Sequence, residues 1–159
     1  MYLNEKIALV SAWIISAISI WFIPKEKRAQ ASFIFLMTQF FTWTIGLTVV
    51  ELGLIQYPVR ELSKANATSF SFEYFILPVI IIFFIIHYPD NKPLKAKILY
   101  YISFSSSITI VEYFIEKHTL IIKYHSWNWY WTWITITALF YIVMSLYKWF
   151  FKIKKVFSL

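Results

Sequence analysis

The stretch ILYYISFSSSITIVEYFIEKHTLII, residues 98–122, decides how the chain is interpreted. A long apolar run leads into two glutamates four residues apart, Glu112 and Glu116, and His118 follows closely behind them. A helix needs about 17–25 mostly apolar residues to cross a bilayer, and this stretch has that length. The two acids therefore mark either the wet end of a membrane helix or a site inside it.

The composition of the whole chain favours lipid as its solvent. Of 159 residues, 60% are hydrophobic and 22% are aromatic, whereas 14% are charged. Soluble domains contain about 45–50% apolar and about 25% charged residues. The mean hydropathy of +0.63 agrees with a membrane protein. The net charge of +7 does not indicate nucleic-acid binding, because Lys and Arg cluster between the apolar runs, as in the cytoplasmic loops of membrane proteins.

Four further apolar segments are comparable in length to the first. Strands of a membrane barrel would be about half as long and would alternate in polarity, which these segments do not. The sequence therefore predicts an all-α polytopic membrane protein, a bundle of five transmembrane helices that form a single domain over residues 1–159. The predicted helices cover residues 7–23, 31–56, 72–88, 98–122 and 127–151.

The positive charges predict how the bundle is oriented. Ten Lys and Arg residues fall on one side of an alternating five-helix path, and five fall on the other. Because positively charged loops stay in the cytoplasm, we expect the N-terminus outside and the C-terminus inside. The ten are Lys25, Lys27, Arg28, Lys92, Lys95, Lys97, Lys148, Lys152, Lys154 and Lys155, and the five are Lys6, Arg60, Lys64, Lys117 and Lys123.

Five of the eight acidic residues gather at the outer depth in this topology. They are Glu51, Glu61, Glu73, Glu112 and Glu116. On the fourth and second helices, residues three or four apart form a polar stripe. A carboxylate that faces lipid is costly, about 2.5–3.5 kcal/mol for Asp at a helix centre, so we expect both stripes to face the bundle interior. The stripes are Ser105, Thr109, Glu112, Glu116 and Thr119 on the fourth helix, and Thr44, Thr48 and Glu51 on the second.

These acids and the bases near them form the candidate site. The candidate ligand- or ion-binding residues are Glu51, Glu73, Glu112, Glu116, Arg60 and His118. Glu51 and Glu112 would be its charged centre, and Arg60 would be the counter-charge. The chain has no cysteine, and the spacing of its acids and histidines matches no recognised metal or catalytic motif. The sequence therefore names no catalytic residue, metal or cofactor.

A structural role for the same residues is the competing interpretation. Glu116 and His118 would then lie at the membrane interface, where long side chains reach water. Glu73, one turn into its helix, would complement the positive helix dipole. The aromatic run WNWYWTW, residues 127–133, would form an interfacial belt. Pro78 would kink the third helix and free a backbone carbonyl near the acids.

Two runs of sequence carry a resemblance to other proteins: ELGLIQYPVRELSKANATSFSFEYFILPV, residues 51–79, and VEYFIEKHTLIIKYHSW, residues 111–127. They resemble an uncharacterised family of small polytopic membrane proteins from Bacillus and related Firmicutes. The resemblance implies a Gram-positive plasma membrane and contributes no activity. The elements that carry it are Glu51, Tyr57, Pro58, Arg60, Lys64, Ala65, Asn66, Phe72, Pro78, Tyr88, Pro89, Glu112, Lys123, Tyr124 and Trp127.

Three functional hypotheses remain open from the sequence. We favour a non-enzymatic membrane protein whose outer acidic cluster binds a cation, a proton or a small ligand, as in a transporter, a channel subunit or a sensor. The first alternative is an accessory or immunity-type subunit in which the acids are structural ion pairs. The second is an enzyme that acts on a lipid or isoprenoid. The expected partners are the lipid bilayer and either further copies of the chain or a larger membrane complex, and not nucleic acid.

Overall fold

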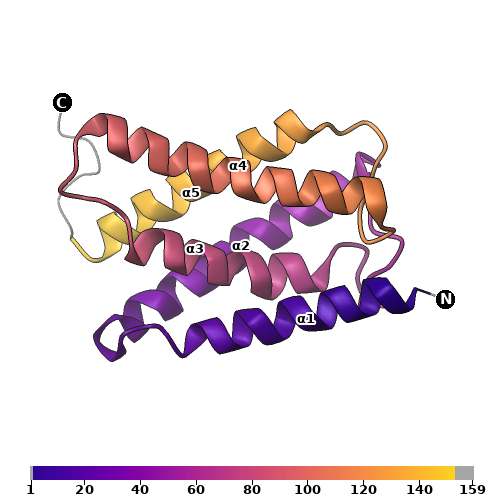
Figure 1. Ribbon diagram of the computed structural model, residues 1–159, viewed down its shortest axis with the longest axis horizontal. Coiled ribbons are helices and arrows are strands. Elements are labelled where there is room, and N and C mark those ends of the chain that lie inside the picture. The colour runs from indigo at the N-terminus through magenta and orange to yellow at the C-terminus, as the bar shows by residue number, and fades with distance from the viewer. Residues whose placement is uncertain (1, 153–159) are drawn as a thin grey trace.

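The computed structural model describes residues 2–152 and contains, within them, five α-helices that run alternately up and down (Figure 1). The helices are α1 (Leu3–Ile20), α2 (Arg28–Glu51), α3 (Leu77–Ile86), α4 (Leu94–His118) and α5 (Trp129–Phe150). A short 3₁₀ turn, η1 (Lys25–Lys27), precedes α2. The prediction of an all-helical, five-helix chain is confirmed. Four of these helices, α1, α2, α4 and α5, are long and apolar enough to cross a membrane.

The third helical segment begins with a π-helical turn, η2 (Ser71–Ile76), which continues directly into α3. Pro78 has no backbone N–H, so it leaves a carbonyl of the preceding turn without a helical partner. Two side chains of α2 bond carbonyls in that turn. The Gln39 amide donates to the Tyr74 carbonyl at 2.8 Å, and the Thr42 hydroxyl donates to the Glu73 carbonyl at 2.8 Å. The predicted freed carbonyl near the acids is therefore present, and it ties η2 to α2.

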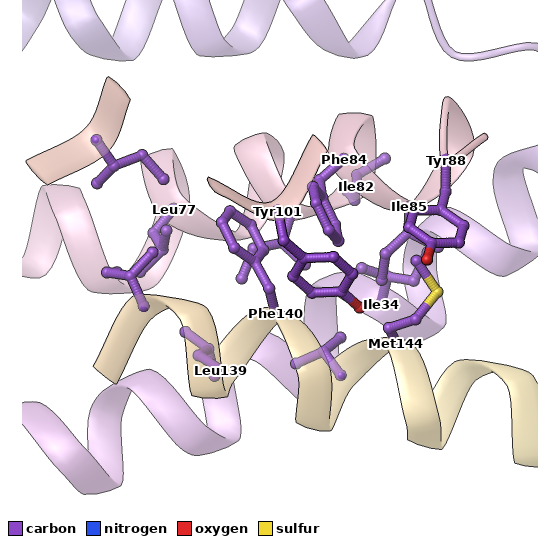
Figure 2. Packing of buried hydrophobic residues seen from close by; sticks show 14 of the residues in the cluster. Ile34, Leu77, Ile82, Phe84, Ile85, Tyr88, Tyr101, Leu139, Phe140 and Met144 are labelled. Carbon is purple, nitrogen blue, oxygen red and sulfur yellow. The ribbon is translucent and has the colours of Figure 1, made fainter. Parts of the chain in front are cut away.

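The segment formed by η2 and α3 is the shortest and the most buried of the bundle. Figure 1 shows it between α1 and α4, with α2 and α5 behind it. At the centre of the core, the rings of Phe84 and Phe140 stack with their centroids 4.2 Å apart, and both side chains are fully buried (Figure 2). Close packing of this kind contributes dispersion energy whatever solvent surrounds the bundle.

Two loops pair with each other at the end of the bundle that carries the start of α1, which is the outer end in the predicted topology, and the sequence did not predict this pairing. Strand β1 (Ile55–Gln56) forms a two-residue antiparallel ladder with β2 (Lys123–Tyr124). The pairing extends outward through a bond from the Val59 N–H to the Leu120 carbonyl at 3.0 Å. The loop after α2 is thereby fastened to the loop between α4 and α5.

The helix α2 ends earlier than predicted, before the strand β1. The helix stops at Glu51 instead of running to residue 56, because Gly53 adopts φ +66. The N–H groups of Gly53 and Leu54 then bond the carbonyls of Val50 and Val49, which is the Schellman end of a helix. The other predicted boundaries differ from the observed ones by a few residues, and α4 ends at His118 rather than at residue 122.

An ion pair closes the opposite, inner end of the bundle. Lys148 of α5 donates to Asp90 in the loop between α3 and α4, and its ammonium group lies 5.0 Å from the centre of the Tyr88 ring. The Lys148 side chain is 5% exposed, whereas that of Asp90 is 50% exposed. Lys148 is thus a buried residue of α5 with a carboxylate partner, and not a free charge of the C-terminal end as the topology count assumed. Two others of the ten, Lys154 and Lys155, lie outside the described residues.

Candidate ligand-binding site

A cavity of about 80 Å³ lies in the outer half of the bundle, between α2, η2, α4 and α5. We call it the polar cavity, because carboxyl and hydroxyl groups lie among its aliphatic and aromatic walls. A single water needs about 10–15 Å³ of such space, so the polar cavity has room for several waters or for a small group. Its polar residues are Thr42, Tyr57, Glu73, Glu112, Thr132 and Thr135.

Glu73 enters the polar cavity from the π-helical turn η2. Its side chain is only 5% exposed, and within residues 2–152 its Oε2 atom has no hydrogen-bond partner. The carboxyl group lies against Gly46 of α2, where a Cβ atom would overlap it. An ionised carboxylate held in the protein interior without a partner is costly. Glu73 is therefore placed to receive a donor that the described part of the chain does not supply.

Glu112 of α4 reaches the same cavity and is held by hydroxyl groups. Its Oε1 atom accepts hydrogen bonds from the Tyr124 hydroxyl and, at 2.8 Å, from the Thr132 hydroxyl. The Trp127 indole N–H in turn donates to Thr132 at 2.8 Å. The β1–β2 ladder positions Tyr124, and the first turn of α5 positions Thr132. Residues of the α4–α5 loop and of the first turn of α5 thus fix the orientation of Glu112.

Tyr57 closes the polar cavity from the outer loop, directly after β1. Its side chain is 8% exposed. Burial raises the pKa of the Tyr57 phenol well above its ordinary value, and the nearby carboxyl groups of Glu73 and Glu112 raise it further. The phenol therefore stays neutral at physiological pH and can donate or accept a hydrogen bond there.

No basic side chain forms an ion pair with Glu73 or Glu112 in the described part of the chain. Arg60, the predicted counter-charge, donates instead to backbone carbonyls of its own loop, from Nη1 to Tyr57 at 2.6 Å and from Nε to Asn66 at 2.8 Å. The prediction for Arg60 is therefore wrong. Its guanidinium bonds the carbonyls of its own loop, and among the described residues the two acids have no ion-pair partner.

Glu51 does not join the other acids. It is exposed at the end of α2 and lines no cavity described here. Thr44 and Thr48 are exposed as well, so the prediction that this stripe of α2 faces inward is wrong. Their hydroxyls bond the carbonyls four residues earlier, at 2.7 Å each, and so need no partner inside the bundle. The inward face of α2 instead carries Thr38, Thr42 and Gly46.

The stripe of α4 does face inward, as predicted. Ser105 and Thr109 are buried, and Glu112 lies in the polar cavity. Glu116, one turn further out, has a side chain that is 13% exposed and lies 3.6 Å from the Lys117 ammonium. His118 is exposed and stacks on Phe114. Neither Glu116 nor His118 lines the polar cavity, and both positions fit the interfacial interpretation.

The sequence did not single out Gly46, Tyr57, Tyr124 or Thr132 as parts of the site. One signal was present for Gly46, because it is one of only two glycines in the chain and lies inside a helix, where glycine is unfavourable. The other three residues meet only through the pairing of two loops. No group of three His, Asp or Glu residues in the 2–152 range is arranged to hold a metal ion.

A second cavity, of about 550 Å³, lies between α1, α3 and α4, and we call it the apolar cavity. Most of its wall is aliphatic or aromatic. Tyr57, Phe72 and Glu112 line both cavities, so the two adjoin at these three residues. The residues around the apolar cavity are Ala8, Leu9, Tyr57, Ser69, Phe72, Ile76, Ile80, Ser103, Phe104, Ser107, Ile108, Val111, Glu112, Ile115, Thr119, Ile121 and Ile122.

Comparison with known proteins identifies no relative of this chain. No protein-family model matches it, and no curated protein or solved structure is significantly similar to it. The resemblance to small membrane proteins of Bacillus and related Firmicutes stays a prediction. The function must therefore be argued from the site.

Proposed function

We propose that this chain is an integral protein of a plasma membrane and that its polar cavity binds a small cation or a positively charged group. In this proposal the helical segments cross the bilayer with the N-terminus outside and the C-terminus in the cytoplasm. Glu73 and Glu112 hold the charge of the ligand, and Tyr57 supplies a neutral hydroxyl beside them. Binding at this site would serve transport or sensing without covalent chemistry.

The observation that carries the proposal is the unpartnered Oε2 atom of the buried Glu73, in a cavity that also contains Glu112. A buried carboxylate oxygen without a donor is costly, and a bound cation removes this cost. A proton would do the same, which makes proton binding the special case of the proposal in which the ligand is H⁺.

Charge-neutral variants of the two acids test the proposal. A ligand that binds only the folded protein raises its free energy of unfolding, by about 2.7 kcal/mol at about 100 times the dissociation constant. We expect Na⁺, K⁺ or ammonium, titrated at constant ionic strength into the purified protein, to raise its Tm. Glu73→Gln and Glu112→Gln should each abolish this increase.

Glu51→Gln is the matched control, because Glu51 is exposed and lines neither cavity. It should retain the full increase in Tm. Should all three variants respond to the cations like the parent protein, the polar cavity would not be the binding site. A different result would identify the ligand as the proton. In that case no cation would change Tm, and the Tm of the parent protein and of Glu51→Gln would depend on pH in a way that the Tm of the other two variants does not.

A further inference from the structure

The apolar cavity has the length of one membrane leaflet. Along α4 its wall extends from Thr119 at the outer end to Ser103 near the middle of the helix. At about 1.5 Å per residue this is about 24 Å. One leaflet with its headgroup region measures about 20–22 Å, half of the full bilayer thickness. The apolar cavity therefore matches the depth of the outer leaflet in the proposed topology.

The apolar cavity is open at the surface of the bundle. Ser103, Ser107 and Val111 of α4 line it and are exposed, so its edge along α4 is not covered by another helix in the described chain. Ala8 and Leu9 of α1 lie on the other side. Figure 1 shows that the segment formed by η2 and α3 lies between α1 and α4. A molecule dissolved in the bilayer could enter between these two helices.

Charge decides what kind of molecule fits. Among the described residues, Glu112 is the one charged residue in the wall of the apolar cavity, and the buried Glu73, whose Oε2 atom has no partner, lies in the adjoining polar cavity. The nearby bases are engaged elsewhere, since Arg60 bonds loop carbonyls and Lys123 donates to the Glu116 carbonyl. A phosphate headgroup would meet acids without a neutralising base. A protonated amine has three donors, and it would meet carboxyl and hydroxyl oxygens, all of which can accept a hydrogen bond.

We propose that the ligand is a single-chain amphiphile with a protonated amino group, drawn from the membrane. Its aliphatic chain lies in the apolar cavity, and its ammonium group lies between Glu112 and Glu73, where the two cavities meet. This inference rests on the proposed function and names the chemical class of the ligand. The volume of about 550 Å³ is within the range of about 300–1,000 Å³ typical of small-molecule sites.

Three probes separate the contributions of chain and charge. Dodecylamine carries both, dodecanol carries the chain without the charge, and propylamine carries the charge on a short chain. Native mass spectrometry of the detergent-solubilised full-length protein would measure the affinity for each probe. Because each buried methylene adds to affinity, dodecylamine should bind at least about tenfold more tightly than propylamine. It should also bind at least about tenfold more tightly than dodecanol, which cannot neutralise the acids.

Filling the apolar cavity tests where the chain lies. Ser107→Phe places a ring in the cavity and should weaken dodecylamine binding about tenfold or more, with propylamine unchanged. Ser145→Phe is the matched control, because Ser145 also bonds the carbonyl four residues earlier but lines neither cavity. If Ser107→Phe does not fold, Ala8→Phe fills the same cavity from α1. Ala17→Phe, on the exposed face of α1, is its control.

The outcomes distinguish the two proposals. Equal affinity for dodecylamine and propylamine, or for dodecylamine and dodecanol, would overturn the amphiphile. So would dodecylamine binding that Ser107→Phe and Ala8→Phe leave unchanged. In these cases binding of propylamine or ammonium that requires Glu73 and Glu112 would leave the proposed function standing. Binding of every amine that is indifferent to Glu73→Gln and Glu112→Gln would overturn both.

Discussion

The carboxyl group of Glu73 rests on the bare Cα atom of Gly46, so closely that a Cβ atom at position 46 would overlap its oxygens. The contact joins η2 to α2 beside the polar cavity. Glycine inside a helix destabilises it by roughly 0.5–1 kcal/mol relative to alanine. At position 46 a larger residue would collide with the Glu73 carboxyl group, so glycine is favoured there despite its cost to the helix.

Gly46→Ala should therefore displace Glu73. The added methyl group overpacks the contact and should lower the free energy of unfolding by about 1–3 kcal/mol, despite the better helix propensity of alanine. Cation binding should weaken as well, because the carboxyl group moves. Chemical denaturation in mild detergent would measure the first effect, and calorimetric titration the second.

Glu73→Ala supplies the control for this contact. The three atoms nearest to the new methyl group all belong to the Glu73 carboxyl group, so Gly46→Ala in the Glu73→Ala background should be neutral or stabilising by up to about 1 kcal/mol. A double-mutant cycle would report this as a coupling between the two positions. Equal costs of Gly46→Ala in both backgrounds would contradict the contact.

Replacing Thr132 should lower the free energy of unfolding more than replacing Thr135, which lies on the same wall of the polar cavity. Thr132→Val removes a donor to Glu112 and leaves the Trp127 N–H without its acceptor, which should cost about 1–3 kcal/mol of unfolding free energy. The Thr135 hydroxyl bonds only carbonyls of its own helix, so Thr135→Val should cost less than about 1 kcal/mol. Tryptophan emission, to which Trp127 is one of eight contributors, should shift in the first variant alone. Similar costs for both would remove the role assigned to Thr132.

The ion pair at the inner end should respond asymmetrically to loss of its partners. Asp90→Asn leaves the ammonium of the buried Lys148 without its carboxylate and should cost about 1–3 kcal/mol. Lys148→Met keeps the aliphatic packing and leaves only the half-exposed Asp90, which water can solvate, so it should stay within about 1 kcal/mol of the parent protein. Thermal unfolding in detergent would rank the two. A larger loss for Lys148→Met would contradict the burial argument.

Cysteine labelling can test the orientation without interference, since the chain has no native cysteine. Lys64→Cys places a thiol in an exposed loop, and Lys95→Cys places one in the exposed first turn of α4, at the opposite end of the bundle. With the N-terminus outside, a membrane-impermeant maleimide should label Lys64→Cys on intact cells and Lys95→Cys only after lysis. The reverse pattern would invert the topology and would place the polar cavity on the cytoplasmic side.

The number and kind of helices followed from the sequence, because they depend on local properties. An apolar run of sufficient length forms a helix in lipid wherever the rest of the chain lies, since no other arrangement of a single segment satisfies its backbone. The inward stripe of α4 was predictable for a related reason. Glu112 lies too deep in its helix to face lipid at low cost, so its own chemistry required α4 to turn that side inward.

Contacts between distant segments decide which side of α2 faces the bundle interior and which groups bond the acids. Hydroxyl groups on a helix can bond their own backbone, so Thr44 and Thr48 carry no information about which side is buried. Arg60 was matched to the acids by charge, but the carbonyls of its own loop are closer partners. Tyr57 and Tyr124 reach the acids only because the β1–β2 ladder brings two loops together. A sequence pattern within one segment predicts which side of that segment would face lipid. The polar cavity, in contrast, is formed by residues from several segments, so no single pattern predicts it.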